Sequence, residues 1–228
     1  MILIDTVYQK VLALANKEQR GYVTPQEFNL LADRAQKEIF ENYFHDIKTA
    51  QMKPKNQTDY ADDVEMIEEK LGDFIATITA WSSTPTFGLS GDIYKLISIQ
   101  RNGNEVTELN QKEILYTENN PLTAATLNRS VYVRSSGGGI TLYPSPTGSE
   151  SITLTYYRQP SSPSWGYIIV NEKALYNSNQ TTNFELHATE EELIVSRILQ
   201  LAGIITMKPG IVEIGGSEVA NTKAEQNN

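Results

Sequence analysis

The clearest structural signal in the chain is the stretch Val23-Thr24-Pro25-Gln26-Glu27-Phe28. Thr24 has the short side-chain oxygen that is favoured at a helix N-cap, and Pro25 takes the first helical position, where its missing N–H is not needed. Glu27 follows Thr24 by three residues, which is the spacing of a capping box. The stretch therefore predicts that a helix begins at Pro25.

The residues after this start continue the helix with a broad apolar face. Apolar side chains recur at steps of three or four, which places them on one side of a helix. They are Phe28, Leu31, Ala35, Ile39, Tyr43 and Ile47, and Phe40 and Phe44 widen the face. So much aromatic surface must pack against other elements, so we expect the other helices to assemble on this one.

Three further segments have helical patterns. Residues 6–16 form an apolar stripe, and residues 189–205 are apolar on most sides, which is typical of a helix that is buried on most sides. Residues 62–79 also begin with helical spacing. Their β-branched end, residues 75–79, is equally compatible with a strand.

The middle of the chain has a strand-like pattern instead of a helical one. Between residues 81 and 176 the apolar segments are short, rich in β-branched residues and broken by turn residues. Asn102-Gly103 is a strong hairpin signal that joins predicted strands at 94–101 and 105–109. Further strands are expected at 130–134, 140–143, 152–157 and 167–170, as in an antiparallel sheet or small barrel.

These patterns predict an α+β protein. We expect a helical bundle built from the N- and C-terminal segments, residues 1–80 and 184–208, with an antiparallel β-rich insertion at 81–183. Residues 209–228 have neither a helical nor a strand pattern, apart from the short apolar run Ile211-Val212-Glu213-Ile214. We therefore expect an extended C-terminal tail.

Composition narrows the functions that are open to the chain. The 228 residues carry a formal net charge of −9 and include no cysteine, which excludes disulfides and thiolate chemistry. An acidic chain does not bind a phosphate backbone through bulk charge. Residues 1–4 are apolar, but Asp5 ends the run and no basic segment precedes it, so we expect no signal peptide. The longest apolar run, residues 193–206, is too short for a membrane span and contains Arg197.

A search for chemistry in the sequence yields no catalytic, cofactor or metal site. The two histidines, His45 and His187, have no metal-ligand spacing, and we interpret them as surface or capping residues. The glycines at 137–139 are not followed by the Lys-Ser/Thr of a phosphate-binding loop. We therefore expect no enzymatic activity.

Two parts of the sequence resemble a known protein class. One is TVYQKVLALANKEQRGYVTPQEFN at 6–29, continued by RAQKEIFENYF at 34–44, and the other is FELHATEEELIVSRIL at 184–199. Both resemble virion structural proteins of short-tailed bacteriophages, including crAss-like phages. The resemblance covers the two ends of the chain. In the β-rich middle it is limited to the general pattern of short, β-branched segments.

This resemblance implies a component of the phage neck. Such a head-to-tail adaptor assembles beneath the portal as a homo-oligomeric ring, by resemblance a dodecamer, and continues the channel through which double-stranded DNA passes. It implies contacts with the portal and other neck or tail proteins, no sequence-specific DNA binding, and a place in the virion after assembly in the bacterial host cytoplasm. The negative net charge of the chain suits a channel through which DNA passes without being bound.

Apolar residues on the broad helices and the tail are the expected partner interface. They are Phe28, Phe40, Phe44, Leu199, Ile205, Ile211, Val212 and Ile214. The rival hypothesis is a carbohydrate- or receptor-binding tail module, in which Trp165, Tyr167 and Tyr157 form an exposed aromatic platform on the sheet. An acidic hydrolase would need converging carboxylates, which the sequence gives no reason to expect.

Overall fold

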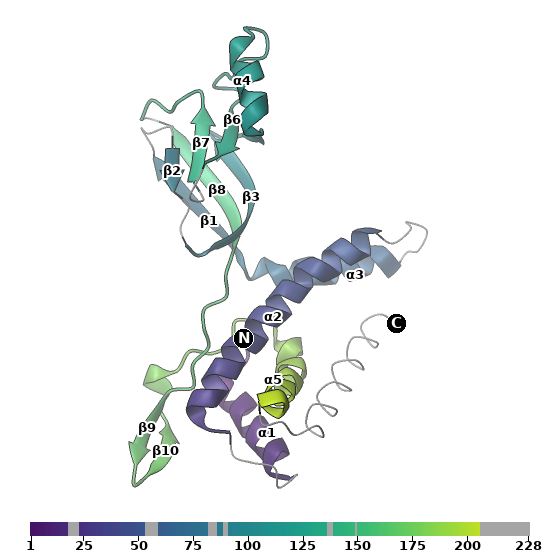
Figure 1. Cartoon of the computed structure of the whole chain (residues 1–228), viewed down its shortest axis with the longest axis vertical. Helices are drawn as coiled ribbons and strands as arrows, with labels where there is room; N and C mark the ends of the chain where they lie inside the picture. The colour runs from purple at the N-terminus through teal and green to yellow at the C-terminus, as the bar shows by residue number, and fades with distance from the viewer. Residues whose placement is uncertain are drawn as a thin grey trace. The chain divides into compact units, whose positions relative to one another are not determined.

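A computed structural model of the chain describes residues 1–17, 23–52, 59–81, 86–88, 91–135, 139–148 and 150–205. The protein is mixed α+β (Figure 1). It divides into two compact units, which we name the helical unit (Met1–Asp73 with Pro160–Asn228) and the sheet unit (Phe74–Gln159).

The helical unit contains four of the described α-helices and a small hairpin. The helices are α1 (Ile4–Lys17), α2 (Pro25–Met52), α3 (Asp59–Gly72) and α5 (Glu191–Ile205), with short 3-10 turns at Ser178–Gln180 and Ala188–Glu190. The hairpin is formed by β9 (Tyr167–Val170) and β10 (Lys173–Tyr176).

The predicted start of α2 is confirmed. The Thr24 backbone N–H donates to Glu27 Oε2 at 3.0 Å, and the Glu27 N–H donates to Thr24 Oγ1 at 3.3 Å, which completes a capping box. The apolar face is confirmed as well, because its members from residue 28 to residue 43 are buried. These are Phe28, Leu31, Ala35, Ile39 and Tyr43, while Ile47 is half-buried.

The core of the helical unit lies among α1, α2 and α5. Helix α5 contacts both α1 and α2, and the Tyr8 ring of α1 lies 4.7 Å from the Phe28 ring of α2. The buried side chains of α1 and α5 include Val7, Tyr8, Val11, Ile194, Val195, Ile198 and Leu199. Arg197 on α5 donates from Nε to Glu38 Oε2 on α2 at 2.5 Å. The buried amide of Gln36 joins α2 to two loops, by donating to the Ser161 carbonyl at 2.7 Å and accepting from the Glu185 N–H at 3.0 Å.

The described residues of the sheet unit form two four-stranded sheets and one α-helix. Its elements are β1 (Ile75–Trp81), β2 (Thr86–Gly88), β3 (Ile93–Arg101), β4 (Asn104–Glu105), β5 (Thr107–Glu108), α4 (Gln111–Asn119), β6 (Val131–Arg134), β7 (Gly139–Tyr143) and β8 (Ser151–Arg158). The strand orders are β1-β8-β3-β4 and β2-β7-β6-β5, and among these pairs only β5 with β6 is parallel.

Both sheets supply side chains to one shared core. Its members come from β3, β6, β7 and β8 and from the loop before β5: Ile99, Val106, Tyr132, Ile140, Leu142, Ile152, Leu154 and Tyr156. Because side chains alternate along a strand, the neighbours of Tyr132 on β6 point to the opposite face. There Val131 and Val133 pack against Ile114 of α4.

The observed boundaries differ from the predicted ones in two places. Residues 75–79, for which the sequence left helix and strand open, are strand, because β1 pairs with β8 over its whole length, from Ile75 opposite Tyr157 to Trp81 opposite Ser151. The sheet unit therefore begins at residue 74 instead of 81. Residues 160–183 belong to the helical unit, because Trp165 and its neighbours bind to α1 and α2.

Candidate assembly surface

The β9–β10 hairpin has a two-residue turn that was not predicted from the sequence. Val170 is paired with Lys173, and the turn residues Asn171 and Glu172 have φ angles of 49° and 63°. Positive φ at both central positions is the geometry of a type I′ hairpin turn. Asn is common in this geometry, but Glu is not, so the prediction ended the strand at Val170 and omitted β10.

Trp165 forms the root of this hairpin. Its side chain is only 3% exposed and lies 4.4 Å from the Tyr8 ring, 5.8 Å from Tyr167 and 5.9 Å from Tyr176, measured between ring centroids. Its indole Nε1 donates to Asp5 Oδ1 at 2.9 Å. The aromatic stack and the hydrogen bond fix the hairpin to the start of α1.

Hydrogen bonds also fix the backbone at the root of the hairpin. The Trp165 N–H donates to Asn29 Oδ1 at 2.8 Å, and the Trp165 carbonyl accepts from Asn29 Nδ2 at 3.3 Å. The next residue, Gly166, donates from its N–H to Thr181 Oγ1 at 3.1 Å. A Cβ at this position would lie 2.6 Å from the Gln180 carbonyl, so the chain requires glycine here.

Beyond its root the hairpin exposes apolar side chains. We name these residues the hairpin patch: Ile168, Ile169, Val170, Leu175 and Tyr176, whose exposed fractions lie between 44% and 72%. The strand register places Ile168, Val170 and Leu175 on one face together with Lys173. On the other face Trp165 stacks on Tyr167 and contacts Tyr176 at a tilt, while Ile169 is exposed there. Neighbouring exposed apolar residues mark an interaction surface more strongly than single ones do.

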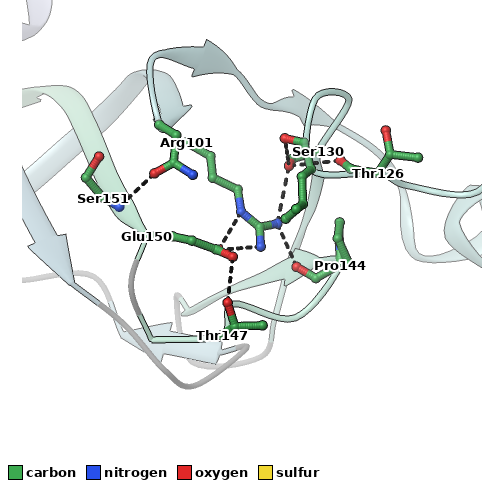
Figure 2. Close-up of polar contacts among 9 residues, drawn as sticks. Arg101, Thr126, Ser130, Pro144, Thr147, Glu150 and Ser151 are labelled. Carbon is green, nitrogen blue, oxygen red and sulfur yellow. Dashed lines mark hydrogen bonds and ion pairs between the residues drawn. The ribbon is translucent and has the colours of Figure 1, made fainter.

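The sheet unit contains a buried ion pair between Arg101 and Glu150 (Figure 2). Arg101, fully buried at the end of β3, donates from Nε and Nη2 to Glu150 Oε2 at 2.8 and 2.5 Å. Its Nη1 donates to Ser130 Oγ at 3.2 Å and to the Pro144 carbonyl at 2.7 Å. Arg101 thus joins segments next to β6, β7 and β8.

Burial acts to raise the pKa of Glu150, but the hydrogen bonds from Arg101 and from Thr147 outweigh it, so the pKa is lowered. The Glu150 carboxylate is therefore held in its charged form. Because the guanidinium is inaccessible and its hydrogen bonds are made within the unit, the cluster connects strands and is not a binding site. Sequence spacing could not reveal it, since Arg101 and Glu150 are 49 positions apart.

The two histidines are not brought together in a metal site. His187 caps a 3-10 turn, with its Nδ1 accepting from the Thr189 N–H at 3.4 Å, as a capping role predicts. His45 is exposed on α2, with its Nδ1 3.6 Å from Asp46 Oδ1. Across the described ranges no three His, Cys, Asp or Glu residues are grouped to hold a metal ion. Among the helices that the structure describes, none has the length and apolar character required for a membrane crossing.

The predicted interface residues occupy different environments. Phe28, Phe40 and Leu199 are buried in the helical unit itself, so they are core residues and offer no surface to a partner; for these three the interface prediction is corrected. Phe44 is half-buried, with its ring 5.2 Å from that of Phe40. Ile205 is the last residue of α5. Ile211, Val212 and Ile214 lie outside the described residues.

The aromatic platform of the rival hypothesis does not form around Trp165. The indole is buried against Tyr8, and Tyr167 and Tyr157 are half-buried. Comparison with known proteins adds no assignment, because no protein-family model matches the chain and no curated protein matches it. The hairpin patch, five exposed apolar residues on one small hairpin, is our candidate for a functional surface.

Proposed function

We propose that the chain is a structural ring subunit of a bacteriophage neck, a head-to-tail adaptor that assembles beneath the portal and continues the DNA channel. The observation that carries the proposal is the hairpin patch, an apolar arm that extends from a firmly fixed root. The resemblance of residues 6–29, 34–44 and 184–199 to virion structural proteins supplies the biological setting. It also suggests a helical bundle with a β-rich insertion and a dodecameric ring.

An arm of this kind suits a ring. When a protruding surface on one subunit binds a different surface on the next, the contact is heterologous, and repeated contacts close into a ring if the rotation allows. The net charge of −9 suits a wall along which DNA moves without being bound. The role involves assembly and passage, and we assign no catalytic residue.

The rival carbohydrate-binding module has less support. Sugar stacking needs an accessible aromatic face, and Trp165, the centre of the expected platform, is 3% exposed. We therefore propose the ring subunit alone.

The native mass of the purified chain tests this proposal, measured over a concentration series and again with a candidate portal protein. We expect a closed oligomer, or a monomer that becomes one on the portal. A chain that stays monomeric at every concentration and with every portal would contradict the proposal.

A further inference from the structure

We propose that the outer edge of β10 accepts residues 211–214 of a neighbouring copy as a third strand. This inference rests on the proposed function, because it names the contact by which ring subunits hold one another. It joins two observations, the incomplete β9–β10 sheet and the chemistry of the tail sequence.

The β9–β10 sheet has an edge that can accept a strand. It consists of two strands of four residues each, and no other strand among the described residues pairs with it. An isolated two-stranded hairpin is marginally stable, whereas a third strand or packing against another element stabilises it. Backbone pairing along a free edge is a common way of binding an extended segment.

The tail contains one segment suited to this edge. Ile211-Val212-Glu213-Ile214 is apolar and β-branched at three of four positions, preceded by Pro209-Gly210 and followed by Gly215-Gly216. Such a run between turn residues is typical of a short strand. The segment belongs to residues 206–228, which follow α5 and lie outside the described residues.

Helix α5 ends toward the part of the helical unit that holds the hairpin root. Near the start of α5, Glu190 binds Lys70 Nζ at 2.7 Å, and this Nζ lies 5.9 Å from the centre of the Tyr43 ring on α2. Farther along, Arg197 binds Glu38, so α5 runs antiparallel to α2, toward the first turns of α2 (Figure 1).

At that end of α2, Asn29 holds Trp165. The end of α5, from which the tail continues, and the acceptor edge therefore lie toward the same end of each copy. An exchange between neighbours is then a heterologous contact, in which each subunit gives its tail and receives another.

Side-chain chemistry selects a register for the added strand. An antiparallel strand with Ile211 opposite Leu175 places Val212 opposite Ala174 and Glu213 opposite Lys173. Ile211 then covers exposed Leu175 on the face that carries Ile168 and Val170, and Glu213 meets the exposed side chain of Lys173. Cross-strand apolar and opposite-charge pairs of this kind stabilise a sheet.

Because the chain has no cysteine, disulfide trapping tests the contact cleanly. Directly opposite antiparallel residues have Cα atoms about 4.5–5.5 Å apart, within the range of about 4.4–6.8 Å that a disulfide spans. Two full-length variants with tags of different size, Leu175→Cys and Ile211→Cys, are mixed and oxidised. We expect a covalent dimer that contains one chain of each kind.

Matched controls use the same chemistry at sites outside the register. Leu30→Cys mixed with Ile211→Cys, and Leu175→Cys mixed with Gln226→Cys, should lose this dimer band. A second measurement reverses the charge pair. Lys173→Glu should weaken self-association about two- to fivefold, the range of an exposed ion pair, and adding Glu213→Lys should restore it.

The outcomes separate this inference from the proposed function. An assembly of normal native mass without the Leu175–Ile211 disulfide would overturn the strand exchange and leave the ring proposal standing. A disulfide that forms only within one chain, in a Leu175→Cys/Ile211→Cys double variant, would also overturn it. A chain that remains monomeric throughout would overturn both.

Discussion

The Trp165 indole Nε1 lies 2.9 Å from Asp5 Oδ1, a hydrogen bond between residues 160 positions apart. The same indole packs at a tilt against the Tyr8 ring, and the backbone N–H and carbonyl of Trp165 both bind the Asn29 side chain. An exposed apolar hairpin thus grows from a buried and well-connected base. This geometry holds the hairpin patch in a defined direction relative to α1 and α2.

Replacing Trp165 by Phe should loosen this base. Phenylalanine keeps an aromatic ring but leaves Asp5 without its donor, and a hydrogen bond to a charged group contributes about 1.5–3 kcal/mol. We expect a loss of this size in the free energy of opening of residues 165–176, measured by hydrogen exchange with mass spectrometry. Tyr167→Phe is the control and should cost about 0.5 kcal/mol or less. Equal losses in the two variants would refute the role of the indole N–H.

Gly166→Ala should destabilise the same region for a steric reason. The new Cβ would lie 2.6 Å from the Gln180 carbonyl and 2.8 Å from the Asn177 carbonyl oxygen, and these backbone atoms would have to shift. Overpacking of this kind costs about 1–3 kcal/mol. Gly72→Ala, where a Cβ meets nothing within 4 Å, is the matched control in denaturant unfolding. A neutral Gly166→Ala would show that the root is not tightly packed.

The buried ion pair of the sheet unit should make its stability depend on acidity. The folded pKa of Glu150 is lowered, so the pair stabilises the folded unit above the ordinary carboxyl pKa. This contribution is lost as the pH falls through the lowered pKa, so we expect the sheet unit to lose protection from hydrogen exchange below about pH 4.

Variants of the pair check this assignment. Glu150→Gln leaves the Arg101 charge buried without its partner, which should cost about 3–5 kcal/mol and weaken the acid dependence. The double variant Arg101→Met/Glu150→Leu should be less destabilised than Glu150→Gln, because it leaves no buried charge. Unchanged acid dependence in Glu150→Gln would assign the effect to other carboxylates.

Local chemistry explains which parts of the fold the sequence could predict. Thr24, Pro25 and Glu27 lie next to one another, and their capping pattern predicted the start of α2 correctly. Asn102-Gly103 likewise predicted the turn between β3 and β4, where both residues have positive φ. Asn171-Glu172 adopts similar angles, but a glutamate gives no such signal, and the hairpin was missed.

The candidate surface could not be predicted from local sequence patterns, because it depends on contacts between residues that are far apart in the sequence. Trp165 was expected to be an exposed aromatic, and its burial follows from Tyr8 and Asp5 at the other end of the sequence. Phe28, Phe40 and Leu199 were expected at an interface, but they fill the core shared by α1, α2 and α5. Helical periodicity identifies an apolar face without identifying what covers it.

The most direct test of the account is the native mass of Ile169→Asp/Leu175→Asp against the unchanged chain, over a concentration series and again with a candidate portal protein. Leu30→Asp is the control, because Leu30 is 74% exposed and Ile169 is 72% exposed, in different elements of the same unit. We predict that the unchanged chain and Leu30→Asp form the same oligomer, while the hairpin variant stays monomeric with its folded stability retained. A hairpin variant that assembles as readily as the unchanged chain would contradict the claim that the hairpin patch is the assembly surface.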